Sequence, residues 1–449
     1  MDTRIRPLRE HLLHGDATAN ELVQQLPLAL RRVLDFEQKN LWRLDRFRAC
    51  SHADDAFDPR FLPESSVVFE LPYVIIQKKS LYILGGLSEG ESVLQNSWLD
   101  RCDSEVRFPI HPTQLHEYSE HLGKAHRADP PERDVRLVGT PTSSVRTLLV
   151  WRDGLPHSAA FVKLSLRSES LGDRRLSRRQ VASSVGLSHF VHNSRSALPT
   201  GLQYFAEPVG LVPRRTPQVG AILRTIPEEV VDGSVIPAPL FALMGGTQGH
   251  PPLLLQLLRR KHGTARDLLD EMLLATFAKL WIALVFDHGL ILEAHGQDLL
   301  LAMSPNLEPL GTFYYRDFEG LTVDWALRRA RGFLEPTFLP HTFEWFSTYE
   351  TWGYPRYQML ATKLWVSLTD FLELVLAELE YALLKWQLSA TIAPEGIESG
   401  VLTRIYSAHL REAIREKFGL IEAADYDIRH QRHRFVKFLM RVRHEILTQ

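Results

Sequence analysis

Cysteine is scarce in this chain, whose 449 residues contain two, Cys50 and Cys102. One pair cannot build the disulfide framework of a small secreted domain, and neither residue lies in a CxxC motif. We therefore expect a reducing, cytoplasmic setting.

Long hydrophobic runs are also missing. The longest, Leu273–Phe286, is interrupted by Lys279 and is shorter than the roughly 20 apolar residues that span a bilayer. The first residues contain no apolar stretch typical of a signal peptide. We expect a protein without a membrane segment.

An excess of one charge is absent as well, since 52 Lys and Arg face 54 Asp and Glu. This balance argues against a general nucleic-acid binder, which carries a basic surplus. Hydrophobic content of 45% and charged content of 24% are ordinary for a globular protein and exclude a disordered chain.

Several familiar catalytic motifs are missing too. The sequence has no GxGxxG after a strand and no GxxxxGK[ST], so a Rossmann or P-loop nucleotide site is not expected. It also lacks GxSxG and the kinase motifs. Without a nucleophile beside its base, positioning and electrostatics are the expected means of catalysis.

Helical and strand patterns occupy different parts of the chain. The first 50 residues have helical spacing, and strand-like runs follow between 66 and 226. Helical spacing returns from 251 and dominates from 321 onward. Because the two kinds of element are segregated, we predict an α+β fold.

A short strand pair is expected inside the helical part, formed by 290–293 and 298–302 around the letters AHGQ. The whole chain divides into three predicted regions: a helical and β N-terminal region (1–104), a β-rich lobe (105–250) and a helical lobe (251–449).

The densest polar cluster follows the helical pattern that begins at residue 251. Glu293, His295, Gln297 and Asp298 stand between apolar segments, and Arg316-Asp317 follows about twenty residues later. Such groups are costly to bury unless they are paired or bind a ligand. Carboxylates near an Arg suit Mg²⁺ and phosphate, although a polar turn with its own hydrogen bonds explains the same residues.

Weaker candidates precede this cluster. Ser144, Arg146 and Thr147 at a loop-to-strand junction can bind phosphate, and an ordinary Ser/Thr-rich turn is the simpler reading. Lys163, in the apolar strand AAFVKLSL, either reaches solvent or faces an anion. His111, in FPIHPTQ, reads on its own as a structural histidine.

These motifs together resemble the NRPS-independent siderophore synthetases of the IucA/IucC (aerobactin synthetase) family. FPIHPTQ is similar to its PVHPWQ, SSVRT to its S-x-R-T loop, and EAHGQD with YRDFEG to its EAHGQN and RD-x-x-G. FVKLSL followed by an Arg, VGAILRTIP and the final FVKFLMRVR also match in order. The resemblance runs from about residue 105 to the end.

The resemblance implies a cupped-hand fold with a shortened thumb (1–104), β-rich fingers and a helical palm, with ATP between fingers and palm. It also implies a reaction. A citrate-like carboxylate attacks the α-phosphate of ATP with Mg²⁺, giving an acyl-adenylate and pyrophosphate, and an amine or hydroxyl then displaces AMP. Such an enzyme is cytoplasmic, binds small molecules rather than nucleic acid or membrane, and in many cases forms a homodimer.

Residue roles follow from the matched motifs. The resemblance implies phosphate or nucleotide binding by Ser144, Arg146, Thr147, Lys163, Gln297 and Asp317; catalysis by His295, Lys163 and Arg175 (or its neighbour Arg174); substrate binding by His295, Arg175, His111, Lys437 and Arg441; and Mg²⁺ binding by Glu293 and Asp317.

The chain departs from the family pattern in ways that keep an alternative open. It has no counterpart of the family's GHP-x-HP segment, HPTQ lacks a Trp, and EAHGQD carries an added negative charge. A degenerate homologue that binds nucleotide or carboxylate without catalysis, or supports a partner synthetase, is the competing hypothesis. An iron-handling protein, suggested by 19 His, is the weakest.

Overall fold

The computed structural model describes residues 16–42, 58–85, 94–115, 118, 135–168, 172–247, 249–260, 263–333, 356–389, 400–419 and 428–448. The chain forms two compact units, and each unit is built from two separate stretches of the sequence. Unit 1 comprises Met1–His192 and Phe205–Ile236, and unit 2 comprises Asn193–Tyr204 and Pro237–Gln449. The predicted division into three regions stays a prediction.

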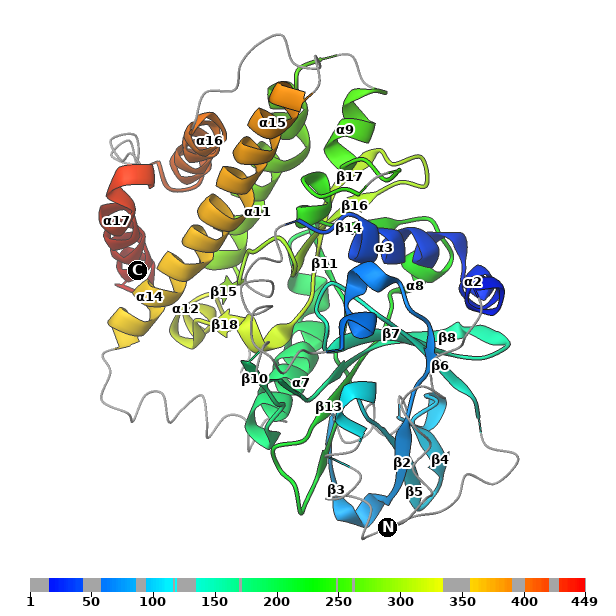
Figure 1. Ribbon diagram of the computed structural model, residues 1–449. Coiled ribbons are helices and arrows are strands. Elements are labelled where there is room, and N and C mark those ends of the chain that lie inside the picture. Colours follow the sequence, from blue (N-terminus) through cyan, green and yellow to red (C-terminus); the bar gives the residue numbers. More distant parts are fainter. Residues whose placement is uncertain are drawn as a thin grey trace. The chain divides into compact units, whose positions relative to one another are not determined.

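Unit 1 is built on a seven-stranded sheet whose neighbouring strands all run antiparallel (Figure 1). Its order is β1 (Phe69–Glu70), β6 (Leu137–Pro141), β7 (Thr147–Arg152), β8 (Leu155–Leu164), β13 (Ala221–Arg224), β12 (Val209–Pro213) and β3 (Leu81–Gly85). A smaller sheet contains β2 (Tyr73–Gln77), β5 (Glu105–Pro109) and β4 (Asp100–Cys102).

The strand runs predicted from sequence are confirmed here. The turn at Asp153-Gly154 joins β7 to β8, and Gly154 has the positive φ of 73° that this turn requires. The run 73–85 forms two strands, β2 and β3, which enter different sheets.

Helix α7 (Arg178–Asn193) covers one face of the large sheet. Val181 and Val185 of α7 pack with Ile222 and Val212 of the sheet. The approach is close, because a Cβ on Gly210 of β12 would lie 2.2 Å from Val181 Cγ1. The opposite face joins a large apolar core with residues such as Phe69, Leu148, Val162 and Leu223, and with the small sheet.

Three further helices belong to unit 1: α2 (Asp16–Gln25), α3 (Leu28–Lys39) and the short α8 (Glu228–Val231). The buried side of α3 carries Leu30, Val33 and Leu34, as its helical spacing predicts. It also buries Glu37 and Gln38, whose polar groups need partners inside the unit.

Unit 2 has a four-stranded sheet in the order β11 (Leu202–Tyr204), β17 (Pro309–Tyr315), β16 (Leu299–Met303) and β14 (Ile236–Pro239), and a small pair of β15 (Leu290–Ile291) with β18 (Thr322–Val323). The runs at 290 and 298 are therefore both strands, but the predicted pairing between them is wrong. β15 pairs with β18, and β16 pairs with β17.

The helices of unit 2 are α9 (Leu253–Leu258), α10 (Ala265–Leu269), α11 (Ala275–Phe286), α12 (Trp325–Ala330), α14 (Arg356–Thr369), α15 (Ala377–Ser389), α16 (Val401–Phe418) and α17 (Ile428–Thr448). A π-helical stretch, Asp370–Leu376, joins α14 to α15, which appear as one long rod in Figure 1. Phe277, Phe313, Phe371 and Tyr406 form an aromatic centre between these helices and the sheet.

The α+β class is confirmed. Among the described residues, no helix is both long enough and apolar enough to cross a membrane.

The contact between α7 and β12 yields a stability prediction. Gly210→Ala should lower the free energy of unfolding by about 1–3 kcal/mol, because the new methyl group forces α7 away from the sheet. Urea denaturation measures the change. Gly201→Ala is the matched control, since its Cβ would meet its nearest atom at an ordinary 3.7 Å. Equal stability of the two variants would contradict the close approach.

Candidate functional site

The predicted site residues fall into two groups, one in each unit. The first group surrounds the loop between β6 and β7. Within it, the amide of Thr147 donates to the Ser144 carbonyl, and Thr142 Oγ1 donates to the Thr147 carbonyl at 2.7 Å. Ser144 and Arg146 are half-buried, whereas Thr147 is buried.

Helix α3 supports this loop from inside the unit. The Ser143 amide donates to Glu37 Oε2 at 3.1 Å, and Gln38 Nε2 donates to Thr140 Oγ1 and to the Pro141 carbonyl, both at 2.8 Å. A buried carboxylate and a buried amide thus fix the backbone of this loop.

Strand register places Lys163 beside this loop. Thr147 of β7 lies opposite Lys163 of β8, which in turn lies opposite Ile222 of β13. Residues opposite each other in neighbouring strands share a face, and this is the face that α7 covers. Lys163 is 1% exposed, so of the two alternatives for this lysine the one in which it reaches solvent is excluded.

His111 is fully buried and holds two motifs together. Its Nδ1 contacts Thr113 Oγ1 at 2.7 Å, and the backbone of Val145, in the loop between β6 and β7, interacts with the ring. Burial lowers the pKa of His111 to about 4, although the Val145 bond acts in the opposite direction. The structural reading of His111 therefore fits its placement, and direct substrate contact stays a prediction.

Gln114, the last residue of HPTQ, makes a two-way backbone contact. Its Nε2 donates to the Arg167 carbonyl at 2.8 Å, and its Oε1 accepts from the Arg167 amide at 3.0 Å. It thereby fixes β9 (Leu166–Ser168), which pairs with β10 (Gly172–Arg174). Arg175 directly follows this hairpin and is half-buried, while the side chain of Arg174 lies outside the described residues.

Unit 1 contains a buried ion pair that the sequence did not predict. Arg224, at the end of β13, donates from Nε and Nη2 to Glu207 Oε1 at 3.0 and 2.6 Å. Ser184 Oγ of α7 donates to the same carboxylate, and Ser188 Oγ accepts from the Glu207 amide. The motif VGAILRTIP contains Arg224, but its partner Glu207 lies 17 residues away in the sequence, where nothing indicates the pairing.

The second group, in unit 2, is the segment Glu293–Asp298 between β15 and β16. Gly296 lets the backbone of Phe241 come close: a Cβ would lie 3.2 Å from the Phe241 nitrogen, which donates to the Gly296 carbonyl. The amides of Asp298 and Leu299 both donate to the His295 carbonyl. This tight turn brings the Asp298 side chain back to the His295 ring.

His295 and Asp298 form a close ion pair, with 2.7 Å between Nε2 and Oδ2. Burial lowers the pKa of His295, but the charge and hydrogen bond of Asp298, with the charges of Asp370 and Glu293, raise it to about 9. The Gln297 amide approaches Nδ1 at 3.3 Å, which suits a neutral ring. The much shorter Asp298 contact, from Nε2, favours the charged ring.

Glu293 completes a group that fits a divalent cation. One ligand atom each from Glu293, His295 and Asp298 lies within 4.8 Å of the others. Burial raises the pKa of Glu293, and Lys363, with its Nζ 4.0 Å from Oε1, opposes this. The two carboxylates offer oxygen ligands, which suit Mg²⁺. Together with the imidazole nitrogen they suit a transition metal.

Asp317, predicted as a second metal ligand, lies outside this group of three. It has a left-handed φ of 72°, a conformation that Asp tolerates better than most residues. Its carbonyl accepts from Tyr315 Oη, and the preceding Arg316 donates from Nε to the Gln297 carbonyl at 2.9 Å. Gln297 and Asp317 are both half-buried. The RDFEG turn is thus tied to EAHGQD.

Gly320 of the same turn makes room for Glu293. A Cβ at position 320 would lie 2.5 Å from Glu293 Oε2, so only glycine lets that carboxylate lie across the turn. Lys437 and Arg441 lie one turn apart on the exposed side of α17, where the Arg441 guanidinium is 5.4 Å from the Phe438 ring.

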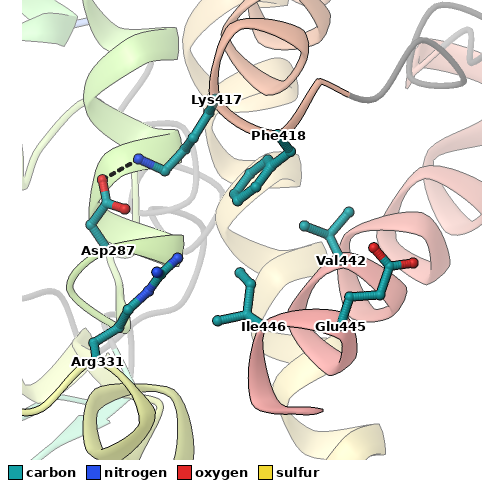
Figure 2. Close-up of a pocket in the computed structure, with 7 residues that line it drawn as sticks. All are labelled: Asp287, Arg331, Lys417, Phe418, Val442, Glu445 and Ile446. Carbon is teal, nitrogen blue, oxygen red and sulfur yellow. Dashed lines mark hydrogen bonds and ion pairs between the residues drawn. The ribbon is translucent and has the colours of Figure 1, made fainter. Parts of the chain in front are cut away.

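A cavity of about 330 Å³ lies elsewhere in unit 2, and none of the predicted site residues lines it. Figure 2 shows Asp287, Lys417 and Arg331 on one side and Phe418 and the α17 residues on the other. Lys417 pairs with Asp287, and Arg331 Nε donates to the Phe286 carbonyl.

Known proteins resemble this chain in sequence and fold. A sequence profile of the IucA / IucC family matches residues 51–245. No curated protein sequence matches. The petrobactin biosynthesis protein AsbB from Bacillus anthracis str. Sterne has a similar structure, with a TM-score of 0.61 at 18% identity, over 83% of this chain and 66% of AsbB.

Two aerobactin synthetases from a hypervirulent pathotype of Klebsiella pneumoniae are similar in the same way. IucC gives a TM-score of 0.60 at 16% identity over 92% of this chain and 78% of IucC. ATP-bound IucA gives 0.57 at 17% identity over 89% of this chain and 75% of IucA. The chain spans just under two thirds of AsbB and about three quarters of the aerobactin synthetases.

The chain thus shares its fold with AsbB and with the two aerobactin synthetases. The predicted resemblance to the IucA/IucC family is confirmed, and the family match includes the Ser144 loop, Lys163 and Arg175.

The His295–Asp298 pair predicts a titration. Asp298→Asn removes both the charge and the ionic hydrogen bond that raise the pKa of His295, so this pKa should fall below about 9. Imidazole NMR of the metal-free protein in EDTA measures it. Asp317→Asn should leave the titration of His295 unchanged. An unaltered pKa in the Asp298 variant would show that other groups hold the proton.

His111 predicts a loss of stability in acid. Its pKa is lowered from 6.5 to about 4 on folding, so the unfolded chain binds the extra proton first. Stability present above pH 6.5 is therefore lost as the pH falls toward 4, by about 3 kcal/mol in all. Urea unfolding across this range should show a shallower pH dependence for His111→Gln. His157→Gln, at an exposed position, should retain the full dependence.

Proposed function

We propose that this chain is a cytoplasmic, ATP-dependent synthetase that adenylates a citrate-like polycarboxylate and joins it to an amine or hydroxyl in the synthesis of a siderophore or related metabolite. The observation that carries the proposal is the grouping of Glu293, His295 and Asp298 within 4.8 Å, inside a motif that resembles the family's EAHGQN. Support also comes from the IucA / IucC match across the Ser144 loop.

The proposed reaction joins two anions, so the chain must supply cationic and hydrogen-bonding groups. A carboxylate oxygen attacks the α-phosphorus of ATP, and pyrophosphate leaves. The nitrogen or oxygen of the second substrate then attacks the acyl carbon, so that AMP and a proton are released. Holding the reactants in line is the main demand on the protein.

Unit 1 provides the proposed triphosphate-binding residues. Ser144, Arg146 and Thr147 belong to a loop whose backbone α3 fixes, so its donors need little reorganisation. Lys163 and Arg175 are proposed to neutralise the α-phosphate and the attacking carboxylate.

Unit 2 provides the proposed carboxylate and metal site. Asp298 holds Nε2 of His295 and the Gln297 amide lies 3.3 Å from Nδ1, so the ring is fixed in place beside the proposed substrate carboxylate. Glu293 and Asp298 supply oxygen ligands that fit Mg²⁺, which when bound would neutralise phosphate charge. Gln297 and Asp317 are proposed to orient the nucleotide. Lys437 and Arg441 are proposed to bind the carboxylate substrate.

A non-catalytic homologue is the second candidate. The observation that favours it is the Asp298 carboxylate, which adds negative charge beside Glu293 where the family motif has Asn. Such a protein would bind ATP but release no pyrophosphate with any carboxylate.

Pyrophosphate release tests the proposal. With ATP, Mg²⁺ and either citrate, 2-oxoglutarate or succinate, the chain should release pyrophosphate, and a polyamine should raise the turnover. Arg146→Ala and His295→Ala should each lower the rate by roughly 10²–10³-fold, because each removes a donor to developing charge. His157→Ala, exposed on unit 1, is the control. Full activity in both site variants would refute the residue assignment.

A further inference from the structure

A lysine on α14 lies beside the carboxylate group of unit 2 and was not singled out by its sequence context. Helix α14 packs against β15, the strand that leads into Glu293. The core side of α14 carries Leu360, Leu364 and Leu368. Lys363 stands at the edge of that side, with Nζ 4.0 Å from Glu293 Oε1.

The pairing between Lys363 and Glu293 is loose. The distance of 4.0 Å is too long for a direct hydrogen bond, and the two side chains are 40% and 34% exposed. An ion pair that is this exposed stabilises a protein little. Among the described residues, Lys363 has no second ion-pair partner, so another anion can replace Glu293 at small cost.

Three arginines of unit 2 are already bound to protein groups. Arg316 is 3% exposed, and its Nε donates to the Gln297 carbonyl at 2.9 Å. Arg443 is held by the Asp324 carboxylate, and Arg328 donates to the His288 carbonyl. Lys363 differs from these three because its ammonium group is half-exposed and weakly held.

We infer that Lys363 binds a carboxylate of the polycarboxylate substrate and thereby helps to determine substrate specificity; this inference rests on the proposed function. An incoming carboxylate takes the place of Glu293 beside the ammonium group. A lysine is a compact point charge with three donors, which suits a single carboxylate of variable orientation. The same charge repels a cationic amine, so the carboxylate and not the amine occupies this position.

Three variants of the full chain test the inference. The substrate is whichever of citrate, 2-oxoglutarate and succinate gives the fastest pyrophosphate release. Lys363→Met should raise both its KM and its Kd, measured by titration calorimetry, by about tenfold or more, because an ionic hydrogen bond is lost. The KM for ATP and the Tm should not change. Lys363→Arg should restore much of the affinity by retaining the charge.

Lys279→Met is the matched control, since it removes one positive charge from a 64% exposed side chain on α11. It should behave as the unmodified chain does. An unchanged KM and Kd for the carboxylate in Lys363→Met, with pyrophosphate release intact, would overturn the role of Lys363 and leave the proposed function standing. A fall in Tm in both Lys363 variants would assign Lys363 a structural role instead. No pyrophosphate release from the unmodified chain would overturn the proposed function together with this inference.

Discussion

The buried ion pair of Arg224 and Glu207 is the constraint around which unit 1 is organised. Glu207 is fully buried and Arg224 is 3% exposed. Each charge loses several kcal/mol of hydration on burial, and this loss must be offset by the opposite charge and by further hydrogen bonds. Ser184 of α7 donates to the Glu207 carboxylate, and Ser188, one turn further along α7, accepts from the Glu207 amide. The position of α7 on the sheet is therefore set by charge as well as by apolar packing, and the absence of a side chain at Gly210 permits the approach.

Unit 2 resolves a similar problem differently. Its polar groups gather in one short segment, where Asp298 turns back on His295 and Glu293 lies across Gly320. In unit 1 the Arg224–Glu207 pair is buried against α7, whereas in unit 2 the side chains of Glu293 and His295 remain partly exposed. Groups that satisfy one another only in part remain able to bind a ligand, which distinguishes a site from a structural pair.

Sequence alone predicted the α+β class, most strands and the helices of the second half, since their periodicities are local. It also identified EAHGQD and YRDFEG as one functional group, which the bond from Arg316 to Gln297 now joins. It mispaired 290–293 with 298–302 because strand partners depend on segments distant in the chain, here β17 and β18. Lys363 and Glu207 were missed for the same reason: each lies in an ordinary context and gains its meaning only from a partner brought close by folding.

The pairing of β15 and β16 with different partners has a consequence for the segment between them. Residues 292–298 begin at one sheet and end at another, so this segment is anchored at both ends by separate sets of strand hydrogen bonds. An ordinary surface loop opens at the cost of its own few contacts, but this one cannot open far unless β15 or β16 leaves its sheet. The conformational entropy of the segment is therefore lost when the chain folds and need not be lost again when a ligand binds.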